Sequence, residues 1–436
     1  MILSFCLASV GGLALALTVA TAQALAVQCG DTVTSDTVLN ADLTCACKDF
    51  FSVLTVEGPA TLDLNGHTVS CGDFDFSLSH CLSIRGNGAT IKNGKVSGCY
   101  FGVGGYNTTD GFVGALIKDI VTSGHGVAGI YMYGKNNILQ NVTAMDYNYG
   151  DGIDVFGNNN SLYNVRATGN SECGIYVVGD NNQVKDSYVA GSALGIQLSG
   201  INNTAISNTV EDIVEGSEYI AGSCIAMYGG VGHVVKNNTV RRCRGFGAYV
   251  YANNAIIADN DFNYISKASI YASGLEDGDR IVTGTKITGN QIANSGADGI
   301  VLGYAQKMVV DNNFIVDIAG NGIVLLRSAA RCTVDNNTIS KCSMAGLRIT
   351  GGHGNNVTDN EISSCKTGIH AGLGSMRNRL IDNHASNNSL FDLSDSSDNC
   401  GSNVWKGNSG KGNIACTTNE WSKVLLRPPA FESLTV

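Results

Sequence analysis

Short apolar stretches separated by asparagine turns recur along most of the chain. Three segments match when written in register: TKITGNQIANSGADGIVLG from Thr285, CTVDNNTISKCSMAGLRITG from Cys332 and NNVTDNEISSCKTGIHAG from Asn355. Each unit reads as an apolar strand, an Asn turn, a second strand and a strand that begins with Gly-Ile or its equivalent. Side chains alternate between two faces along a strand, so one set points inward. The pattern predicts an all-β protein.

One asparagine sets the period of this pattern. It recurs in steps of 30, 22, 30, 23, 24, 23 and 23 residues at Asn208, Asn238, Asn260, Asn290, Asn313, Asn337, Asn360 and Asn383. Apolar residues three before and two after it predict an inward position, where amides of stacked coils can hydrogen-bond. The period continues upstream at Asp119, Asn141, Asn164 and Asp186. The two longer steps place inserted loops near 211–222 and 274–284.

A period of 22 to 24 residues with three strands per unit is typical of one coil of a parallel β-helix. Proline supports this interpretation, because the chain has none between Pro59 and Pro428. Proline has no N–H and would break the hydrogen bonds between coils. We therefore expect a single right-handed parallel β-helix solenoid of about 12–13 coils.

The repeats resemble those of right-handed parallel β-helix proteins of the pectin-lyase-like superfamily, especially those with NosD-type repeats. CGDTVTSDTVLNADLTC and LDLNGHTVSCG resemble their N-terminal cap and first coil, and LFDLSDSSDNCGSNVWKGN resembles their last coil. The resemblance covers about residues 29–416. It implies the fold but no single activity, because this superfamily includes pectate and alginate lyases, polygalacturonases, mannuronan C5-epimerases and non-enzymatic proteins.

The two ends of the chain differ from the repeats. Residues 1–26 lack Lys, Arg, Asp and Glu and end in Ala-Leu-Ala, which predicts a cleaved secretory signal peptide, with an uncleaved anchor as the alternative. We expect an N-terminal cap over 27–60, the β-helix over 61–416 and a C-terminal tail over 417–436. No later segment is apolar for long enough to span a membrane.

Cysteine usage points to the same compartment. Fourteen of the 15 cysteines lie beyond the signal peptide, an even number that suits disulfides in an oxidising environment. We expect Cys29 to pair with Cys45 or Cys47, and Cys400 with Cys416. The protein is therefore predicted to be secreted, extracellular or in the cell wall.

The Gly-Ile strands carry a row of aromatic residues. The position after each Gly-Ile should point outward, and down the coils it reads Tyr131, Asp154, Tyr176, Gln197, Ala226, Tyr249, Tyr271, Val301, Val324, Arg348 and His370. The next outward position adds Tyr133, Phe156, Tyr228 and Tyr251. A ridge of roughly 30 Å at the usual strand spacing suits stacking against sugar rings. The alternative is that Tyr is simply a favoured strand residue.

Carboxylates interrupt this ridge. Asp154 lies between Tyr131 and Tyr176, Asp151 precedes it by three residues, and His125, Asp146 and Glu172 are expected on adjacent coils. A carboxylate cluster beside aromatic residues predicts a catalytic site. Asp151 and Asp154 could serve as the acid and the base or nucleophile of a glycoside hydrolase. The alternative is that both are turn and ladder residues.

A polyuronate lyase or C5-epimerase would use the same site differently. Tyr131, Tyr133, Tyr176 or His125 would exchange protons with the sugar. Lys135 or Arg166 would face the uronate carboxylate. Gly124-His125-Gly126 resembles the Gly-His-Gly of polygalacturonases, but the accompanying Asp pair and Arg-Ile-Lys are missing.

The net charge of the chain limits the classes of partner that it can bind. A net charge of −10 argues against nucleic acid as a partner, and we expect a monomer that meets a polysaccharide. No cofactor is predicted; calcium is the alternative, because an Asp-rich edge supplies oxygen ligands. Asn107 is the expected glycan site and Asn141, predicted to point inward, the least expected. A non-catalytic glycan-binding or wall protein is the competing hypothesis.

Overall fold

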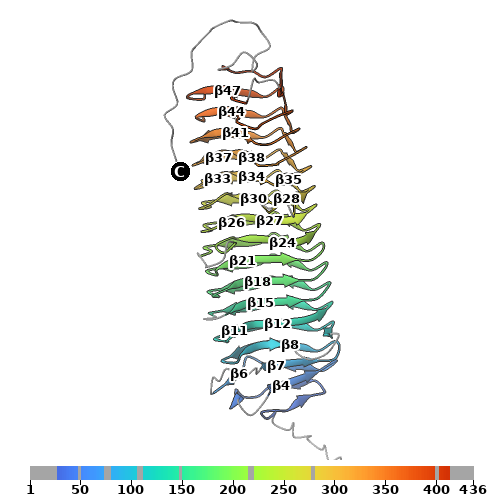
Figure 1. The fold of residues 1–436 in the computed structure, drawn as a ribbon. Coiled ribbons are helices and arrows are strands. Elements are labelled where there is room, and N and C mark those ends of the chain that lie inside the picture. Colours follow the sequence, from blue (N-terminus) through green and yellow to red (C-terminus); the bar gives the residue numbers. More distant parts are fainter. Residues whose placement is uncertain are drawn as a thin grey trace, which may run out of the picture.

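The structure is a computed structural model that describes residues 27–47, 51–72, 80–105, 111–146, 150–214, 220–275, 280–397 and 402–412. The predicted signal peptide, the C-terminal tail, Asn107 and the Cys400–Cys416 pair lie outside these residues. The elements are β-strands, and the strand pairings of the described residues are all parallel (Figure 1). No helix of the described residues has the length and apolar character needed to cross a membrane.

One face of the solenoid is a 17-stranded sheet, called sheet A below. Its strands follow one another along the axis, one in each coil except that β9 and β10 share a coil and both pair with β12. They are β1 (Thr32–Val33), β4 (Ser52–Glu57), β7 (His80–Arg85), β9 (Phe101–Gly104), β10 (Phe112–Val113), β12 (Ala128–Lys135), β15 (Asp151–Phe156), β18 (Cys173–Val178), β21 (Leu194–Ser199), β24 (Ile225–Val231), β27 (Ala248–Asn253), β30 (Ile270–Ser273), β34 (Ile300–Gly303), β38 (Ile323–Leu326), β41 (Ala345–Thr350), β44 (Thr367–Ala371) and β47 (Phe391–Asp395).

The other strands form two parallel runs that close the cross-section. The first run contains β2 (Thr37–Val38), β5 (Thr61–Asp63), β13 (Ile138–Gln140), β16 (Ser161–Tyr163), β19 (Gln183–Lys185), β22 (Thr204–Ile206), β25 (Val234–Lys236), β28 (Ile256–Ala258), β32 (Lys286–Thr288), β36 (Val309–Asp311), β39 (Thr333–Asp335), β42 (Asn356–Thr358), β45 (Arg379–Ile381) and β48 (Val404–Lys406). The second contains β3 (Leu43–Cys45), β6 (Thr68–Cys71), β14 (Thr143–Met145), β17 (Arg166–Thr168), β20 (Tyr188–Ala190), β23 (Thr209–Glu211), β26 (Thr239–Arg241), β29 (Asp261–Asn263), β33 (Gln291–Ala293), β37 (Phe314–Ile318), β40 (Thr338–Cys342), β43 (Glu361–Ser363) and β46 (His384–Ser386). Two long strands, β8 (Thr90–Ser97) and β11 (Leu116–Ser123), belong to both runs, and β31 (Val282–Thr283) pairs with β35 (Ala305–Gln306).

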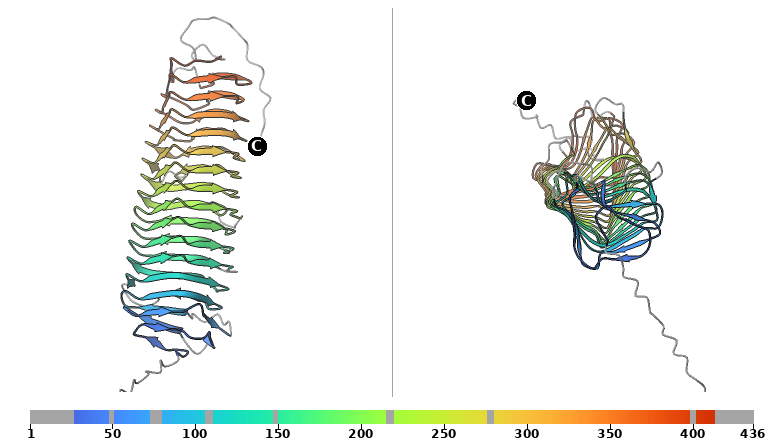
Figure 2. Two further views of the ribbon diagram at one scale, coloured as in Figure 1. Left: turned by 180° about the vertical axis from the view of Figure 1, so that it is seen from behind. Right: turned by 90° about the horizontal axis from the view of Figure 1, so that it is seen from below.

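The predicted fold class is confirmed, and the solenoid has about 15 turns rather than 12–13. The difference arises at the N-terminal end, where the Asn repeat is absent but the chain already winds. Strands β1, β2 and β3 pair with β4, β5 and β6 as one turn pairs with the next. Figure 2 shows the stack from behind and along its axis, where the coils superimpose in one cross-section.

The glycine before several of the sheet A isoleucines is explained by packing inside the coil. A Cβ added at Gly174 would lie 2.2 Å from Val189 Cγ1, and one at Gly322 would lie 2.4 Å from Ile339 Cγ2. At these two positions a larger residue would therefore collide with a side chain of β20 or β40. Because glycine and isoleucine both face the core here, the residues on either side of the pair point outward.

The predicted asparagine column is confirmed as an internal ladder. Asn208 to Asn383 are at most 1% exposed, and the side-chain Nδ2 of each donates to Oδ1 of the next, for example from Asn238 to Asn260 at 2.9 Å. A second ladder, not predicted, runs through Asn137, Asn160, Asn182 and Asn203 and resumes at Asn355, Asn378 and Asn403. These amides satisfy backbone groups at corners where the strands end.

The residues predicted to continue the ladder upstream are wrong by one position. Asp119, Asn141, Asn164 and Asp186 have positive φ and form the outer turn, whereas the interior column holds the residue after each of them. Asparagine and aspartate tolerate this left-handed conformation. Asn141 is therefore exposed, and the expectation that it points inward is corrected.

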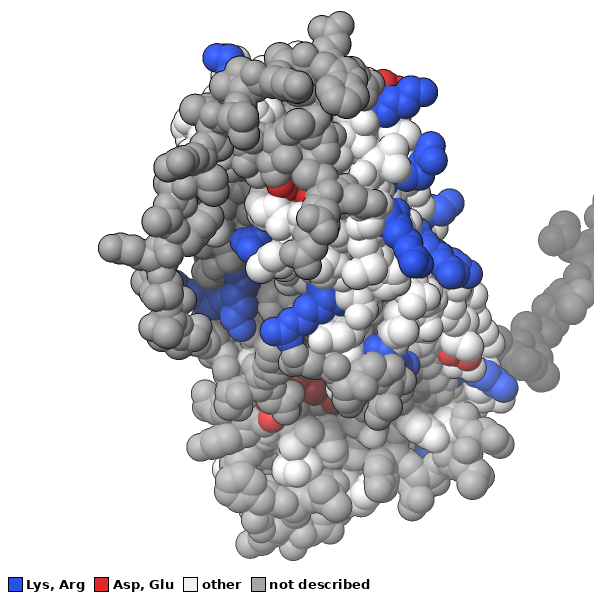
Figure 3. All heavy atoms as spheres, turned by 45° about the horizontal axis from the view of Figure 1, so that its top comes forward, with Lys and Arg blue, Asp and Glu red and all other residues white. Residues whose placement is uncertain are grey.

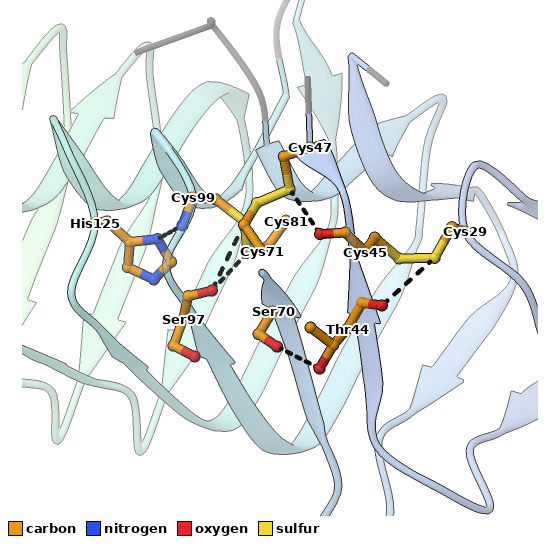
Figure 4. Close-up of a disulfide and its surroundings, with 10 residues drawn as sticks. All are labelled: Cys29, Thr44, Cys45, Cys47, Ser70, Cys71, Cys81, Ser97, Cys99 and His125. Atoms are coloured by element: carbon orange, nitrogen blue, oxygen red, sulfur yellow. Dashed lines mark hydrogen bonds between the residues drawn. A yellow bond between two sulfur atoms is a disulfide. The ribbon is translucent and has the colours of Figure 1, made fainter. Parts of the chain in front are cut away.

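The described residues form four disulfides: Cys29–Cys45, Cys47–Cys71, Cys81–Cys99 and Cys224–Cys243, of which Cys47–Cys71 joins one coil to the next and the others lie within one coil. Cys29 thus pairs with Cys45, one of its two expected partners. Figure 4 shows the first three bridges close together at the N-terminal end. Such bridges fit an oxidising compartment. Cys173, Cys332, Cys342 and Cys365 remain free thiols, although the even cysteine count suggested full pairing.

Candidate functional site

The outward positions of sheet A separate the predicted aromatic ridge into two regions. The first, called the aromatic stack, consists of Phe51, His80, Phe101, Tyr131, Phe156 and Tyr176, whose neighbouring rings have centroids 4.9 to 5.7 Å apart. The second surrounds a pocket formed farther along the axis. Gln197 and Ala226 occupy the outward column between them. The ridge is therefore two sites of different character.

Asp154 lies inside the aromatic stack, as the sequence predicted. Its Cα pairs with that of Tyr131 on β12 and with that of Tyr176 on β18. Its side chain is 4% exposed, and its carboxyl hydrogen-bonds to that of the half-buried Asp151 on the same strand. The other oxygen of Asp154, Oδ1, is buried without a hydrogen-bond partner. The two carboxyls therefore form a pair in a largely dry setting.

Burial decides the protonation of this pair. Desolvation, followed by the negative charge of Asp151, raises the pKa of Asp154 to about 10. Desolvation also raises the pKa of Asp151, while hydrogen bonds from Asp154 and from the Cys173 amide, at 2.5 Å, oppose the rise. One proton is shared, and Asp154 holds it more tightly than Asp151 does, because the hydrogen bonds at Asp151 oppose the rise in its pKa. Near neutral pH the site therefore holds a neutral Asp154 carboxyl beside a more acidic partner.

Two neighbours of the pair lie on the next coil. Cys173 begins β18, directly beside Asp151 in the strand register, and burial beside these carboxyls raises its thiol pKa. The preceding residue, the exposed Glu172, adds to the negative charge that Asp154 feels. Cys173 was missed because every cysteine was interpreted as structural. Its place at the start of a Gly-Ile strand was the available signal.

Tyr131 and Tyr176 flank Asp154 and are both partly exposed. Desolvation and the nearby thiol and carboxyls raise the pKa of Tyr176, so its phenol stays protonated near neutral pH. Phe156 packs between them, with centroids 5.4 Å from Tyr131 and 5.7 Å from Tyr176. Tyr133 is 40% exposed one outward position farther along β12. These rings form the walls around the acid pair.

His125 points into the coil interior instead of toward the acid pair. It is 3% exposed, and its Nδ1 accepts the amide N–H of Cys99 at 3.2 Å (Figure 4). Its Nε2 lies 3.2 Å from the Val96 carbonyl. Burial lowers its pKa to about 4, so the ring is neutral. The ladder asparagines make the same kind of contact: each accepts a hydrogen bond from a backbone N–H at the corner of the preceding coil. The structure therefore gives His125 a structural position.

The two expected cations also lie apart from the pair. Lys135 is the exposed last residue of β12. Arg166 belongs to β17, outside sheet A, and its guanidinium lies 4.1 Å above the Tyr188 ring. The pattern could not separate Arg166 from the site because it follows Asp154 closely in sequence but falls on another side of the coil.

The second region is a pocket of about 720 Å³, called the central pocket. Its lining includes Gln197, Tyr228, Tyr249, Tyr271, Ser273 and Arg327. Tyr228 is 48% exposed, whereas Tyr249 is 6% exposed and stacks on Tyr271 with centroids 6.0 Å apart. Burial and the neighbouring tyrosines raise the pKa of Tyr249 to about 12. The pocket combines aromatic faces with hydroxyl, amide and guanidinium donors, the combination that binds sugars.

Tyr251 packs against Tyr228, a lining residue of the central pocket. It is 7% exposed, its ring centroid lies 5.6 Å from that of Tyr228, and the Arg280 guanidinium lies 4.6 Å from its centroid. All four predicted tyrosines of this region, Tyr228, Tyr249, Tyr251 and Tyr271, are therefore clustered.

Potential metal ligands gather elsewhere. Within the described ranges, three ligand atoms approach one another within 4.8 Å only in Cys47, Cys71 and Cys99 and in Cys81, Cys99 and His125. All four of these cysteines are joined in disulfides (Figure 4). The sulfur clusters are thus structural bridges.

Charge is distributed unevenly along the axis. In Figure 3, where the C-terminal end comes forward, Lys and Arg side chains dominate the charged groups on the visible described surface. The acid pair and Glu172 lie toward the N-terminal half of sheet A, in β15 and just before β18. Arg327, at the central pocket, belongs to the more basic half.

A family model described as "Right handed beta helix region" matches residues 80–231, 223–383 and 275–422 of the chain. These three overlapping matches span most of the described coils. No curated protein is similar enough in sequence to be matched to the chain.

Several solved structures are similar at low identity. The periplasmic alginate epimerase AlgG gives a TM-score of 0.49 at 14% identity, covering 74% of this chain and 85% of that chain. PfbA, a surface adhesin of Streptococcus pneumoniae, gives 0.44 at 16%, covering 75% and 84%. DFA-IIIase from Arthrobacter chlorophenolicus A6 gives 0.43 at 14%, covering 76% and 89%. Likenesses this distant carry no argument about activity.

Proposed function

This chain belongs to the right-handed β-helix family, and from the residues on sheet A we propose that it is a secreted protein that binds a polysaccharide and acts on it by proton transfer. The substrate is a polyuronate, and the reaction is that of a lyase or C5-epimerase. The observation that carries the proposal is the proton-sharing pair of Asp151 and Asp154 between two tyrosines.

Substrate binding is supported by the central pocket. Tyrosine faces can stack on sugar C–H groups, while Gln197, Ser273 and Arg327 meet hydroxyls and a carboxylate. The pocket and the acid pair lie on the same sheet, so one extended chain along the solenoid would contact both. The basic C-terminal half favours an anionic polysaccharide.

The acid pair can perform the chemistry of a lyase or epimerase. Asp151, held as a carboxylate, would take the C5 proton. On substrate binding, neutral Asp154 would turn its one O–H hydrogen bond from Asp151 to the uronate carboxyl, so it could stabilise the developing charge without a nearby cation. The phenol of Tyr131 or Tyr176 would return a proton to C5 in an epimerase or to the leaving oxygen in a lyase.

Hydrolysis is less compatible with this geometry. Retaining and inverting glycosidases separate their carboxyls by about 5 to 9.5 Å, to fit a sugar carbon or a water between them. Asp151 and Asp154 instead hydrogen-bond to each other, at the much shorter reach of such a bond. This pair is therefore better suited to proton transfer.

A second candidate function is glycan binding without turnover. It is favoured by the separation of the two regions, because the central pocket extends from Gln197 on β21 to Arg327 after β38, coils away from Asp154. In that case the acid pair would be a structural feature of the stack.

A substrate panel tests the proposal. Purified protein is incubated with alginate, pectin and a neutral polysaccharide, and three products are followed. Unsaturated uronates absorbing at 235 nm indicate a lyase, exchange of the C5 proton with deuterated solvent without cleavage indicates an epimerase, and new reducing ends without unsaturation indicate a hydrolase. Binding without any of the three would support the second candidate and contradict catalysis.

A further inference from the structure

Two free thiols lie at the same corner of consecutive coils. Ser340 on β40 pairs in register with Ser363 on β43, so Cys342 and Cys365, each two residues farther on, are stacked one above the other. The amide N–H of Cys342 donates to Cys365 Sγ at 3.3 Å. Adjacent coils are spaced at about 4.8 Å, within the Cα separation of about 4.4 to 6.8 Å that a disulfide needs.

The same corner carries disulfides elsewhere in the solenoid. Following the register from β26 to β40, Cys243 occupies the position of Cys342. Cys243 is bonded within its own coil to Cys224, which replaces the glycine before the sheet A isoleucine. The Cys81–Cys99 bridge also uses a cysteine in that glycine position.

Cys342 and Cys365 have no such partner within their own coils. The facing positions are Gly322 and Gly346, where an added Cβ would lie 3.3 Å from Cys342 Sγ and 3.4 Å from Cys365 Sγ. The remaining described free thiols, Cys173 and Cys332, belong to other sides of the coil: Cys173 to sheet A, Cys332 to the turn before β39. Each of the two cysteines therefore has the other as its available partner.

We propose that Cys342 and Cys365 form a dithiol site that small-molecule disulfides oxidise to a disulfide between coils, with Cys365 as the attacking thiol. The site borders a hollow of about 520 Å³ that is also lined by Ser343, Ser364 and Lys366. Through this hollow a small disulfide can approach the corner. The exposed ammonium of Lys366 favours a thiolate nearby.

The roles of the two sulfurs differ. Hydrogen bonds from Cys342, first from its thiol, lower the pKa of Cys365 despite burial. The pKa of Cys342 is raised by the same thiol contact and by burial. When the pair loses a proton, Cys365 is therefore the thiolate and Cys342 keeps its proton.

The reaction is an ordinary thiol–disulfide exchange. The Cys365 thiolate attacks one sulfur of the small disulfide, forming a mixed disulfide and releasing one thiolate. Cys342 then loses its proton, attacks Cys365 Sγ and releases the second small thiol. Two protein thiols are oxidised as one small disulfide is reduced to two thiols.

Peptide mapping of the native full chain tests this site. The folded protein is incubated with oxidised glutathione at pH 8, quenched with N-ethylmaleimide in acid and digested with trypsin without reduction. Cleavage after Lys341, Arg348 and Lys366 separates the two cysteines onto peptides 342–348 and 349–366. We expect these peptides to be joined and the free-thiol content to fall by two. The proposal is overturned if both cysteines carry maleimide, or if either is joined to another cysteine.

Three variants refine the assignment. In Cys342→Ser, Cys365 should stop at the mixed glutathione disulfide, whereas in Cys365→Ser, Cys342 should react at least tenfold more slowly. Equal reactivity of the two would contradict the assigned roles. Cys332→Ser, which removes a buried thiol at another corner, should leave the joined peptides unchanged. The result for the unmodified chain does not depend on whether any variant folds.

Discussion

The aromatic stack and the central pocket are built from the same outward positions of sheet A, yet they differ in what they enclose. In the stack the rings pack on one another and isolate two carboxyls that share a proton. In the central pocket the rings stand around an opening of about 720 Å³ with Arg327 at its lining. The stack is therefore suited to chemistry and the pocket to binding.

This difference originates in single residues on an otherwise uniform scaffold. Placing Asp between two Tyr in the outward column buries a charge, and burial then raises the pKa of Asp154 to about 10. Placing Gln197 and Ala226 in the same column ends the stack and leaves room beyond it. Aromatic periodicity alone does not distinguish the two outcomes.

The largest effect is expected from Asp154→Asn. Asparagine has the same shape and can still donate a hydrogen bond, but its amide is a much weaker acid than a neutral carboxyl and stabilises developing negative charge less. We expect turnover of the polyuronate to fall by about 100-fold or more, as for loss of a hydrogen-bond donor that stabilises the transition state. The initial rate at 235 nm, or C5 deuterium exchange, measures it.

Asp146→Asn is the matched control for this substitution. Asp146 is exposed in the turn of the preceding coil, at a positive φ that asparagine also adopts. It should retain full turnover. If Asp154→Asn is as active as Asp146→Asn, the aromatic stack has no catalytic role and only the central pocket remains functional.

The next effect is on stability in mild alkali. The pKa of Asp154 is about 10 in the folded protein and about 4 when unfolded, so the folded state holds a proton that the unfolded chain has lost. Stability should therefore fall as pH rises through this window, by about 1.4 kcal/mol per unit, or roughly 2 kcal/mol from pH 6.5 to 8. Urea unfolding of the parent and of Asp154→Asn measures the difference, and the variant should lose most of this slope. Parallel slopes would show that Asp154 is ionised in the fold.

His80 should give the opposite pH dependence at acid pH, where the free energy of unfolding rises with pH. It is 1% exposed in the aromatic stack, both ring nitrogens are buried without partners, and burial lowers its pKa to about 4. Below pH 6.5 the imidazole of His80 binds a proton in the unfolded chain but stays neutral in the folded chain. The free energy of unfolding should therefore fall as the pH drops from 6.5 toward 4. His80→Phe should preserve the stacking on Phe101 and remove roughly 2 kcal/mol of this loss at pH 5. Unfolding curves at pH 5 and 7 test it, and equal stability loss in both proteins would contradict it.

The sequence predicted which residues share a column better than which way they point. Asp154 was placed between Tyr131 and Tyr176, and the strand register confirms that adjacency. The interior position of Asn208 and its successors followed from flanking apolar residues. Upstream, the interior column switches to Ile120, Val142, Val165 and Ser187, so the outer turn residues Asn141 and Asn164 were mistaken for it.

Other parts of the site could not be predicted from the sequence, because the direction of their side chains depends on how the chain turns at the corners of the coil. His125 follows a glycine with positive φ, and its side chain points into the interior. There the backbone N–H of Cys99 donates a hydrogen bond to the Nδ1 of its ring. Arg166 lies beyond the next corner, above Tyr188. The proton shared by Asp151 and Asp154 arises from burial by neighbouring coils, which no local pattern encodes.

The smallest effect is expected in the central pocket, from Tyr228→Ala. Tyr228 is 48% exposed, so its loss should leave folding intact while removing one sugar-stacking face. We expect oligosaccharide affinity to weaken about tenfold, equivalent to about 1.4 kcal/mol, as measured by calorimetry. Tyr264→Asn is the control, because Tyr264 is 61% exposed at a positive φ in the turn after β29, outside sheet A, and should bind normally. Asp154→Asn should also bind normally; if it loses affinity while Tyr228→Ala does not, binding and chemistry both belong to the aromatic stack, and the assignment of the two regions is reversed.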